Sequence, residues 1–205
     1  TYREMFSKTL EYAKAIKAVA PQALVTGPVT AGWAGNVNLI EAPDASKYKG
    51  DFLDNYITAT KGCVDVLDTH YYPGGNLDDK MMDMAQMKLS ELASPAAQAV
   101  RVQLPRSLWD SSYLEPEWES FNLTDGEPLK LIPRLQEKID RLNPGMKIAV
   151  TEYYFGASMD ISGGIAQADA LGIWGKEGVF AANAFPNAEN KQVFLYAAFN
   201  MFRNF

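Results

Sequence analysis

The feature that most constrains the fold is a repeated alternation of short apolar runs with longer segments of helical periodicity. An amphipathic helix is predicted over residues 2–20, and apolar runs of strand length follow at 23–29, 63–70, 147–150 and 178–185. Segments with helical spacing stand between and after these runs, at 51–61, 77–92, 129–142, 163–176 and 191–205. This alternation predicts parallel strands joined by crossover helices.

Two α/β architectures satisfy this order, a doubly wound sheet and a (β/α)₈ barrel. No GxGxxG motif and no P-loop follows any of the predicted strands, which disfavours a nucleotide-binding sheet. A full barrel needs eight strands and about 250 residues. We therefore predict half of a (β/α)₈ TIM barrel, with parallel strands five to eight and their helices. Residues 1–205 would form one incomplete barrel domain with a long proline-punctuated insertion at 94–128.

Composition excludes several classes of function. The chain of 205 residues is 47% hydrophobic and 21% charged, which is enough to build a core. Its net charge of -6 argues against nucleic acid as a partner, and no apolar run reaches the roughly 18 residues of a membrane span. The single cysteine, Cys63, excludes an internal disulfide. The single histidine, His70, excludes most of the ligand spacings of zinc sites. We expect no metal and no cofactor.

Glu152 is the first candidate site residue, because it ends an apolar strand. Side chains alternate along a strand, so Ile148, Val150 and Glu152 are predicted to share one inward face. A carboxylate beside an apolar face is costly unless it is paired or used in chemistry. Three aromatic residues at 153–155 follow at once and offer flat faces for a sugar ring.

Polar residues also end the neighbouring predicted strands. Asp68 and His70 share the face of Val64 and Val66, and Asn183 lies near the end of the run at 178–185. Because barrel enzymes carry their catalytic groups at the C-terminal ends of strands, these side chains and Glu152 are predicted to meet at one rim. The alternative for Asp68 and His70 is a hydrogen-bonded pair that only caps a strand.

Aromatic residues provide the remaining candidates for substrate binding. Each of them alone is more typical of core or rim packing. Together, around a carboxylate, they are typical of a site for the C–H face of a pyranose. The predicted platforms are Trp33, Tyr71, Tyr72, Trp109, Trp118 and Tyr154, and His70 is predicted to hold a sugar hydroxyl or to orient Glu152.

Four runs carry a family resemblance. They are YAKAIKAVAPQALVTGP, LDTHYYP, RSLWDSSYLEPEW and TEYYFGASMDISGGIAQADALGIWGKEGVFAAN. They resemble glycoside hydrolase family 44, the endoglucanase and xyloglucanase family. The resemblance implies a (β/α)₈ barrel with an added β-sandwich, a secreted bacterial enzyme, and cleavage of β-1,4-glucans with retention of configuration. By position, the nucleophile of the family falls on Glu152.

The general acid/base of that family lies in an Asn-Glu-Pro motif at the end of the fourth strand, and this motif is absent from the sequence. Glu127-Pro128 follows Gly126 in a predicted loop and is not accepted as a substitute. The resemblance therefore implies that the acid/base lies upstream of Thr1. The isolated chain is expected to be inactive, because catalysis would need the N-terminal half of the barrel. The expected substrate is a β-glucan.

Two alternatives remain open at this point. The first is a non-catalytic glucan-binding or degenerate barrel fragment, which would hold a saccharide without cleaving it. The second keeps the hydrolase class and makes Asp68 the acid, so that this chain alone would carry both carboxyl groups.

Overall fold

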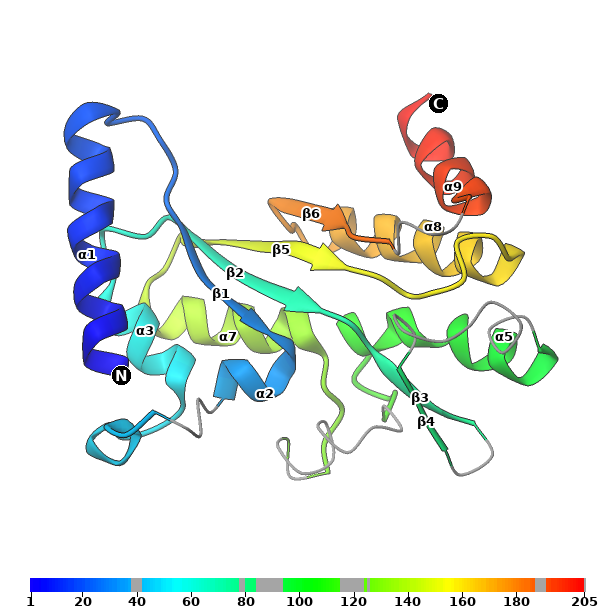
Figure 1. Cartoon of the computed structure of the whole chain (residues 1–205), viewed down its shortest axis with the longest axis horizontal. Coiled ribbons are helices and arrows are strands. Elements are labelled where there is room, and N and C mark those ends of the chain that lie inside the picture. The colour runs from blue at the N-terminus through cyan, green and yellow to red at the C-terminus, as the bar shows by residue number, and fades with distance from the viewer. Residues whose placement is uncertain are drawn as a thin grey trace.

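The computed structural model of the chain describes residues 1–37, 42–77, 80–83, 94–114, 124, 126–186 and 191–204. Its centre is a parallel sheet of four strands in the order β1-β2-β5-β6 (Figure 1). The strands are β1 (Thr26–Ala31), β2 (Val66–Tyr71), β5 (Lys147–Tyr153) and β6 (Ala181–Ala184). The prediction of an α/β fold with parallel strands is therefore confirmed. Among the described residues, β1 and β6 are the two edges of this sheet.

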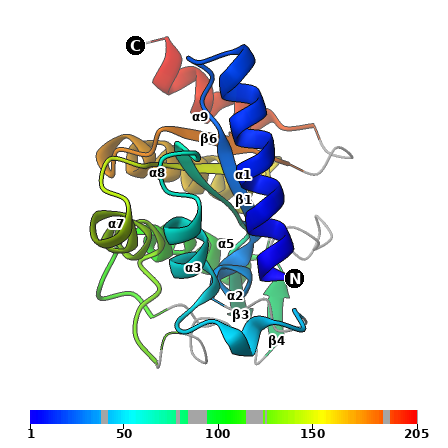
Figure 2. The ribbon, with the colours of Figure 1, turned by 90° about the vertical axis from the view of Figure 1, so that its left-hand side faces the viewer.

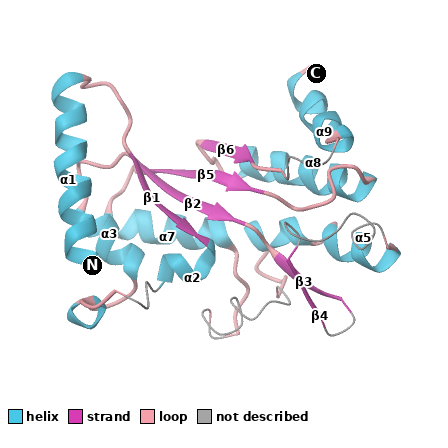
Figure 3. Cartoon of the chain, in the orientation of Figure 1, coloured by secondary structure: helices cyan, strands magenta, loops and turns pink. Residues whose placement is uncertain are grey.

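Helices connect the strands (Figure 3). They are α1 (Tyr2–Val19), α2 (Gly32–Val37), α3 (Phe52–Ala59), α5 (Pro95–Arg101), α7 (Leu131–Leu142), α8 (Ile161–Lys176) and α9 (Val193–Arg203), with short 3₁₀ turns η1 (Ala45–Lys47) and η2 (Leu104–Leu108). Local signals explain several ends. Asp51 and Asp160 accept hydrogen bonds at the starts of α3 and α8, and Gly62 and Gly178 have the positive φ that suits a turn after a helix.

The core lies between one face of the sheet and the helices. Leu67 of β2 and Ile148 and Val150 of β5 pack in one cluster with Ile57 of α3 and Ile139 of α7. Figure 2 views the ribbon along the sheet and shows α3 and α7 together beside the strands. Burying these branched side chains contributes roughly 1.5–3 kcal/mol each, so the sheet is fixed chiefly from this side.

Three predicted segments differ from the structure. Residues 80–83 of the predicted helix at 77–92 form β4 (Lys80–Asp83), which pairs antiparallel with β3 (Gly74–Leu77), and residues 84–93 lie outside the described part. The segment at 94–128, predicted as irregular, contains α5 and η2. The glycine-rich stretch at 31–38, predicted as a loop, contains α2. For α2, which packs against α3 and β2, and for α5, which packs against α8, contacts with distant residues outweigh a weak local pattern.

Candidate active site

Glu152 lies at the C-terminal end of β5 and is held by two side chains from the neighbouring strand. Tyr72 Oη donates a hydrogen bond to Glu152 Oε2 at 2.7 Å, and His70 Nδ1 lies 3.1 Å from the same oxygen. The Glu152 side chain is 34% exposed and that of His70 is 20% exposed. The carboxylate is therefore oriented by neighbours and still open to solvent.

A register shift places Glu152 on this face. In β2 and β5, Asp68 pairs with Ala149, but His70 pairs with Glu152, because the ladder shifts after Thr69. Ile148 and Val150 point into the helix-covered core, so the prediction that they share the face of Glu152 is wrong. The irregularity turns Glu152 to the face of Asp68 and His70. Bulges next to active sites commonly re-aim a side chain in this way.

Asp68 is buried below this pair, with 1% of its surface exposed. It accepts hydrogen bonds from Thr26 Oγ1 at 3.1 Å, from Thr151 Oγ1 at 2.9 Å and from the Thr151 amide at 3.2 Å. These donors come from β1 and from β5, so Asp68 ties three strands together. Its supporting role at the site stays a prediction.

The Tyr72 hydroxyl is a lasting donor to Glu152. Burial, the hydrogen bond to Glu152 and the charge of that carboxylate together raise the pKa of Tyr72 above its ordinary value. The Tyr72 hydroxyl thus stays protonated at neutral pH and can donate its hydrogen bond to Glu152. Its contact is with the proposed nucleophile, a role that differs from the sugar platform predicted for it.

Three aromatic residues predicted as sugar platforms are buried instead. Tyr71 is 3% exposed and donates to Ser107 Oγ at 2.6 Å, while Tyr154 is 3% exposed and contacts Ser158 through its hydroxyl. Trp33 is 4% exposed within the core cluster. Their faces are covered by neighbouring side chains, so we correct their assignment from substrate binding to packing.

The remaining predicted positions are spread over the chain. Asn183 is exposed on β6, between Ala182 and Ala184, which pack against the core, so it points to the other face of the sheet. Trp109 lies beside the helical layer, where Lys176 Nζ of α8 is 4.0 Å from the centre of its ring. The structure does not bring Trp109 to Glu152. Trp118 lies outside the described residues.

The hydroxyl groups around Asp68 were not predicted from the sequence. Thr26 and Thr151 are ordinary strand residues, and their importance depends on the pairing of β1, β2 and β5. A threonine directly before the candidate glutamate was the available signal, because two adjacent polar residues at a strand end break the alternation of faces.

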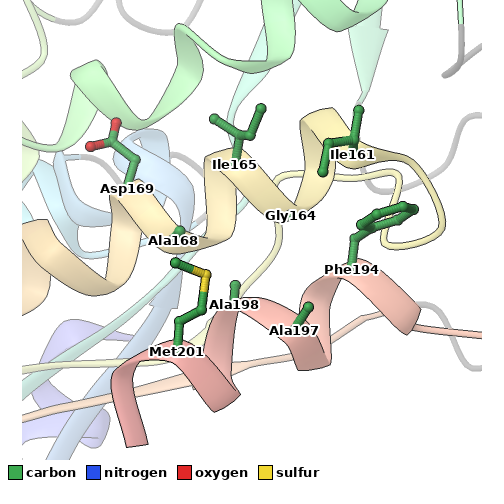
Figure 4. Close-up of a pocket in the computed structure, with 9 residues that line it drawn as sticks. All are labelled: Ile161, Gly164, Ile165, Ala168, Asp169, Phe194, Ala197, Ala198 and Met201. Atoms are coloured by element: carbon green, nitrogen blue, oxygen red, sulfur yellow. The ribbon is translucent and has the colours of Figure 1, made fainter. Parts of the chain in front are cut away.

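A hollow lies away from Glu152, between α8 and α9 (Figure 4). Its volume is about 480 Å³ and its lining is mostly apolar, with one carboxylate. The lining residues are Ile161, Gly164, Ile165, Ala168, Asp169, Phe194, Ala197, Ala198 and Met201. Burial raises the pKa of Asp169 above its ordinary value. This groove contains none of the predicted site residues.

Two further observations concern the described residues alone. They contain no group of three or more histidine, cysteine, aspartate or glutamate side chains placed to hold a metal ion. None of the helices within them combines the length and the apolar composition that a membrane crossing requires.

Comparison with solved structures defines the class of protein. The chain superposes on a Paenibacillus polymyxa xyloglucanase from glycoside hydrolase family 44, solved with xyloglucan, with a TM-score of 0.90 and 31% identity, covering 100% of this chain and 40% of that one. It also matches Cel44A, a family 44 endoglucanase from Clostridium thermocellum, with a TM-score of 0.86 and 33% identity over 98% of this chain and 40% of that one. The fold of this chain is therefore similar to part of the fold of family 44 glycoside hydrolases.

Sequence comparison gives the family. The family model described as glycoside hydrolase family 44 matches residues 1–75. Endoglucanase A of Paenibacillus lautus is 37% identical over 216 residues, which cover 98% of this chain and 29% of that protein. The chain is therefore homologous to glycoside hydrolase family 44, as its motifs predicted, and spans less than a third of this curated relative.

Proposed function

We propose that the chain is the nucleophile-bearing half of a (β/α)₈ barrel in a retaining endo-β-1,4-glucanase that acts on cellulose or xyloglucan. The homology to family 44 endoglucanases and xyloglucanases supports the substrate class. The observation that carries the mechanism is the pair of contacts from Tyr72 and His70 to one oxygen of a solvent-accessible Glu152.

In this mechanism Glu152 attacks the anomeric carbon of a bound glucan and forms a covalent glycosyl intermediate, which water then hydrolyses. Tyr72 and His70 hold the carboxylate in place and keep one oxygen engaged, so that it does not have to reorganise during attack. Asp68 fixes the strand ends on which all three residues stand.

A retaining enzyme needs a second carboxyl group about 5–5.5 Å from the nucleophile, to protonate the leaving oxygen. Asp68 is a poor candidate, because it is 1% exposed and accepts hydrogen bonds from the Thr26 hydroxyl, the Thr151 hydroxyl and the Thr151 amide. We propose that a glutamate upstream of this chain supplies the acid/base, on strands that complete the barrel against the open edges β1 and β6. The isolated chain would then be inactive, and the whole protein would be secreted.

The test compares the 205-residue chain with the same chain carrying its natural upstream sequence. Each form is incubated with xyloglucan and carboxymethyl cellulose, and reducing ends and the anomer first released are measured. We expect turnover with retained configuration from the longer form alone. A 2-deoxy-2-fluoro-glucoside inhibitor should label Glu152, which peptide mass spectrometry locates. Labelling of another residue, or inverted product, would refute the mechanism, and binding without turnover would favour a glucan-binding protein.

A further inference from the structure

The segment formed by α5 and η2, residues 95–108, contains two fully buried polar side chains. Arg101 and Ser107 are both 0% exposed. A buried guanidinium is rare unless it is paired, because removing its charge from water is costly. These two side chains face different neighbours, and each neighbour belongs to a segment that leads to the candidate active site.

Arg101 binds the start of α8. Its Nη1 donates to Ser162 Oγ at 2.5 Å and lies 3.9 Å from Asp160 Oδ1. Gln98 adds a hydrogen bond to Asp160 Oδ2 at 2.9 Å, and Asp160 also accepts from the Ser162 amide at 2.9 Å. Burial opposes ionisation of Asp160, but the Ser162, Gln98 and Arg101 contacts outweigh it and hold its pKa below the ordinary value. This end of α8 is therefore fixed to α5 by a charge-assisted network.

The loop between Glu152 and this network is tightly held. Ala157 has a φ of 48°, which is uncommon for a residue other than glycine, and the Ser158 carbonyl accepts from the Phe194 amide at 3.0 Å. Gly163 of α8 lies so close that a Cβ there would be 2.1 Å from the Ala157 carbonyl oxygen. A shift of the start of α8 would therefore be transmitted to the end of β5.

Ser107 binds the other strand. Tyr71 Oη donates to Ser107 Oγ at 2.6 Å, and Ser107 Oγ donates to the Leu104 carbonyl at 2.7 Å. Tyr71 is the last residue of β2 and directly precedes Tyr72, the donor to Glu152. The same short segment thus contacts the end of β2 and the start of α8, and Gly163 of α8 lies against Ala157 in the loop that leads back to β5.

We propose that residues 95–108 act as a clamp: Arg101 and Ser107 are positioning residues that fix the ends of β5 and β2 relative to each other, so that Tyr72 and His70 meet Glu152. This inference rests on the proposed function for its kinetic consequences and on the contacts above for its geometry. Arg101 and Ser107 touch no substrate in this proposal and act only through the strand ends.

The experiment uses the natural full-length protein with the variants Arg101→Met, Gln98→Ala and Ser107→Ala. The matched control is Arg106→Met, which lies in η2, pairs with Asp110 and contacts neither strand end. We expect Arg101→Met to lower kcat about 10- to 100-fold with little change in KM, because small misplacement of a reacting group is costly. Gln98→Ala and Ser107→Ala should give smaller losses, and the rate at which the fluoro-glucoside labels Glu152 should fall in parallel.

A second measurement does not depend on hydrolysis. The proteins are labelled with 3-fluorotyrosine, and the ¹⁹F resonance of Tyr72 is assigned with Tyr72→Phe. We expect this resonance to move, and to titrate at lower pH, in Arg101→Met but not in Arg106→Met. Unchanged kcat and an unchanged Tyr72 resonance in a folded Arg101→Met or Gln98→Ala protein would overturn the clamp. If the unmodified protein hydrolyses no glucan, the proposed function fails, while the resonance still decides the clamp.

Discussion

Glu152 and Asp160 lie on the same strand-loop-helix unit, yet their surroundings differ in kind. The side chain of Glu152 is 34% exposed and contacts a tyrosine hydroxyl and a histidine. The side chain of Asp160 is 16% exposed and contacts a buried arginine, a glutamine and the start of a helix. The first environment orients a carboxylate and leaves it open to solvent. The second uses up its hydrogen-bonding capacity. The exposure of the carboxylate and the burial of its partners therefore separate a carboxylate suited to chemistry from one suited to structure.

Replacing the carboxylate of Glu152 should have the strongest effect on activity. Glu152→Gln in the full-length protein should reduce glucan hydrolysis at least about 10³-fold, because an amide cannot form the glycosyl ester. The measurement is reducing-end release, with urea unfolding of the same protein. Glu137→Gln, an exposed change on α7, is the control. Substantial residual activity in Glu152→Gln would assign the nucleophile elsewhere.

Replacing Asp160 should chiefly lower the stability of the protein. Asp160→Ala should lower the free energy of unfolding by about 3 kcal/mol, since it leaves the Arg101 charge buried beside a weakened helix start. Equilibrium denaturation in urea measures this loss. Asp140→Asn, which removes the charge of a surface carboxylate that accepts a hydrogen bond from Gln136, should change stability by less than about 0.5 kcal/mol. Equal effects of the two substitutions would contradict a structural role for Asp160.

Tyr72→Phe removes one hydroxyl donor from Glu152. We expect kcat to fall about 10- to 100-fold, because a hydrogen bond to a charged group contributes about 1.5–3 kcal/mol. Steady-state kinetics on xyloglucan measure this change. Tyr12→Phe, on the exposed side of α1, serves as the control. A KM effect with normal kcat would instead place Tyr72 in direct contact with substrate.

The smallest effect concerns pH. Because the folded pKa of Asp160 is lowered, its contribution to stability is present above the unfolded value of about 3.9 and is lost as pH falls through the folded value. Asp169 has a raised folded pKa, so its contribution is present at low pH and is lost as pH rises. Asp169→Asn should therefore be more stable than the unmodified protein at pH 7, and this difference should shrink at pH 3. Thermal unfolding of both proteins at the two pH values measures it. The opposite sign would contradict burial as the cause.

The sequence predicted the sheet well, because the strand and helix periodicities of a βα repeat are local signals. It also predicted that Asp68, His70 and Glu152 meet at one rim, since parallel strands end on the same side. The reason given for Glu152 was wrong, because strict alternation ignores the register shift beside Thr69. A bulge depends on the partner strand and leaves no periodic trace.

The aromatic residues were harder to assign. Tyr71 and Tyr72 are adjacent in the sequence, but one is buried against Ser107 and the other reaches Glu152. Trp33 was predicted at the rim, yet α2 carries it into the core. Residue type alone does not reveal which face of a ring is covered, because that depends on helices distant in the chain. The helix α5 with Arg101 was missed for the same reason.

The close approach of α8 to its neighbours also limits how this protein can be engineered. Gly163 and Gly164 stand in the first turn of a 16-residue helix, where alanine would ordinarily add about 1 kcal/mol of stability each. Here an added methyl group would strike the Ala157 carbonyl from one position and come within 2.9 Å of Phe194 Cβ from the other. Replacing either glycine by alanine to raise thermostability would therefore displace α8 from its neighbours. Gly175 has open space around it and accepts the same change.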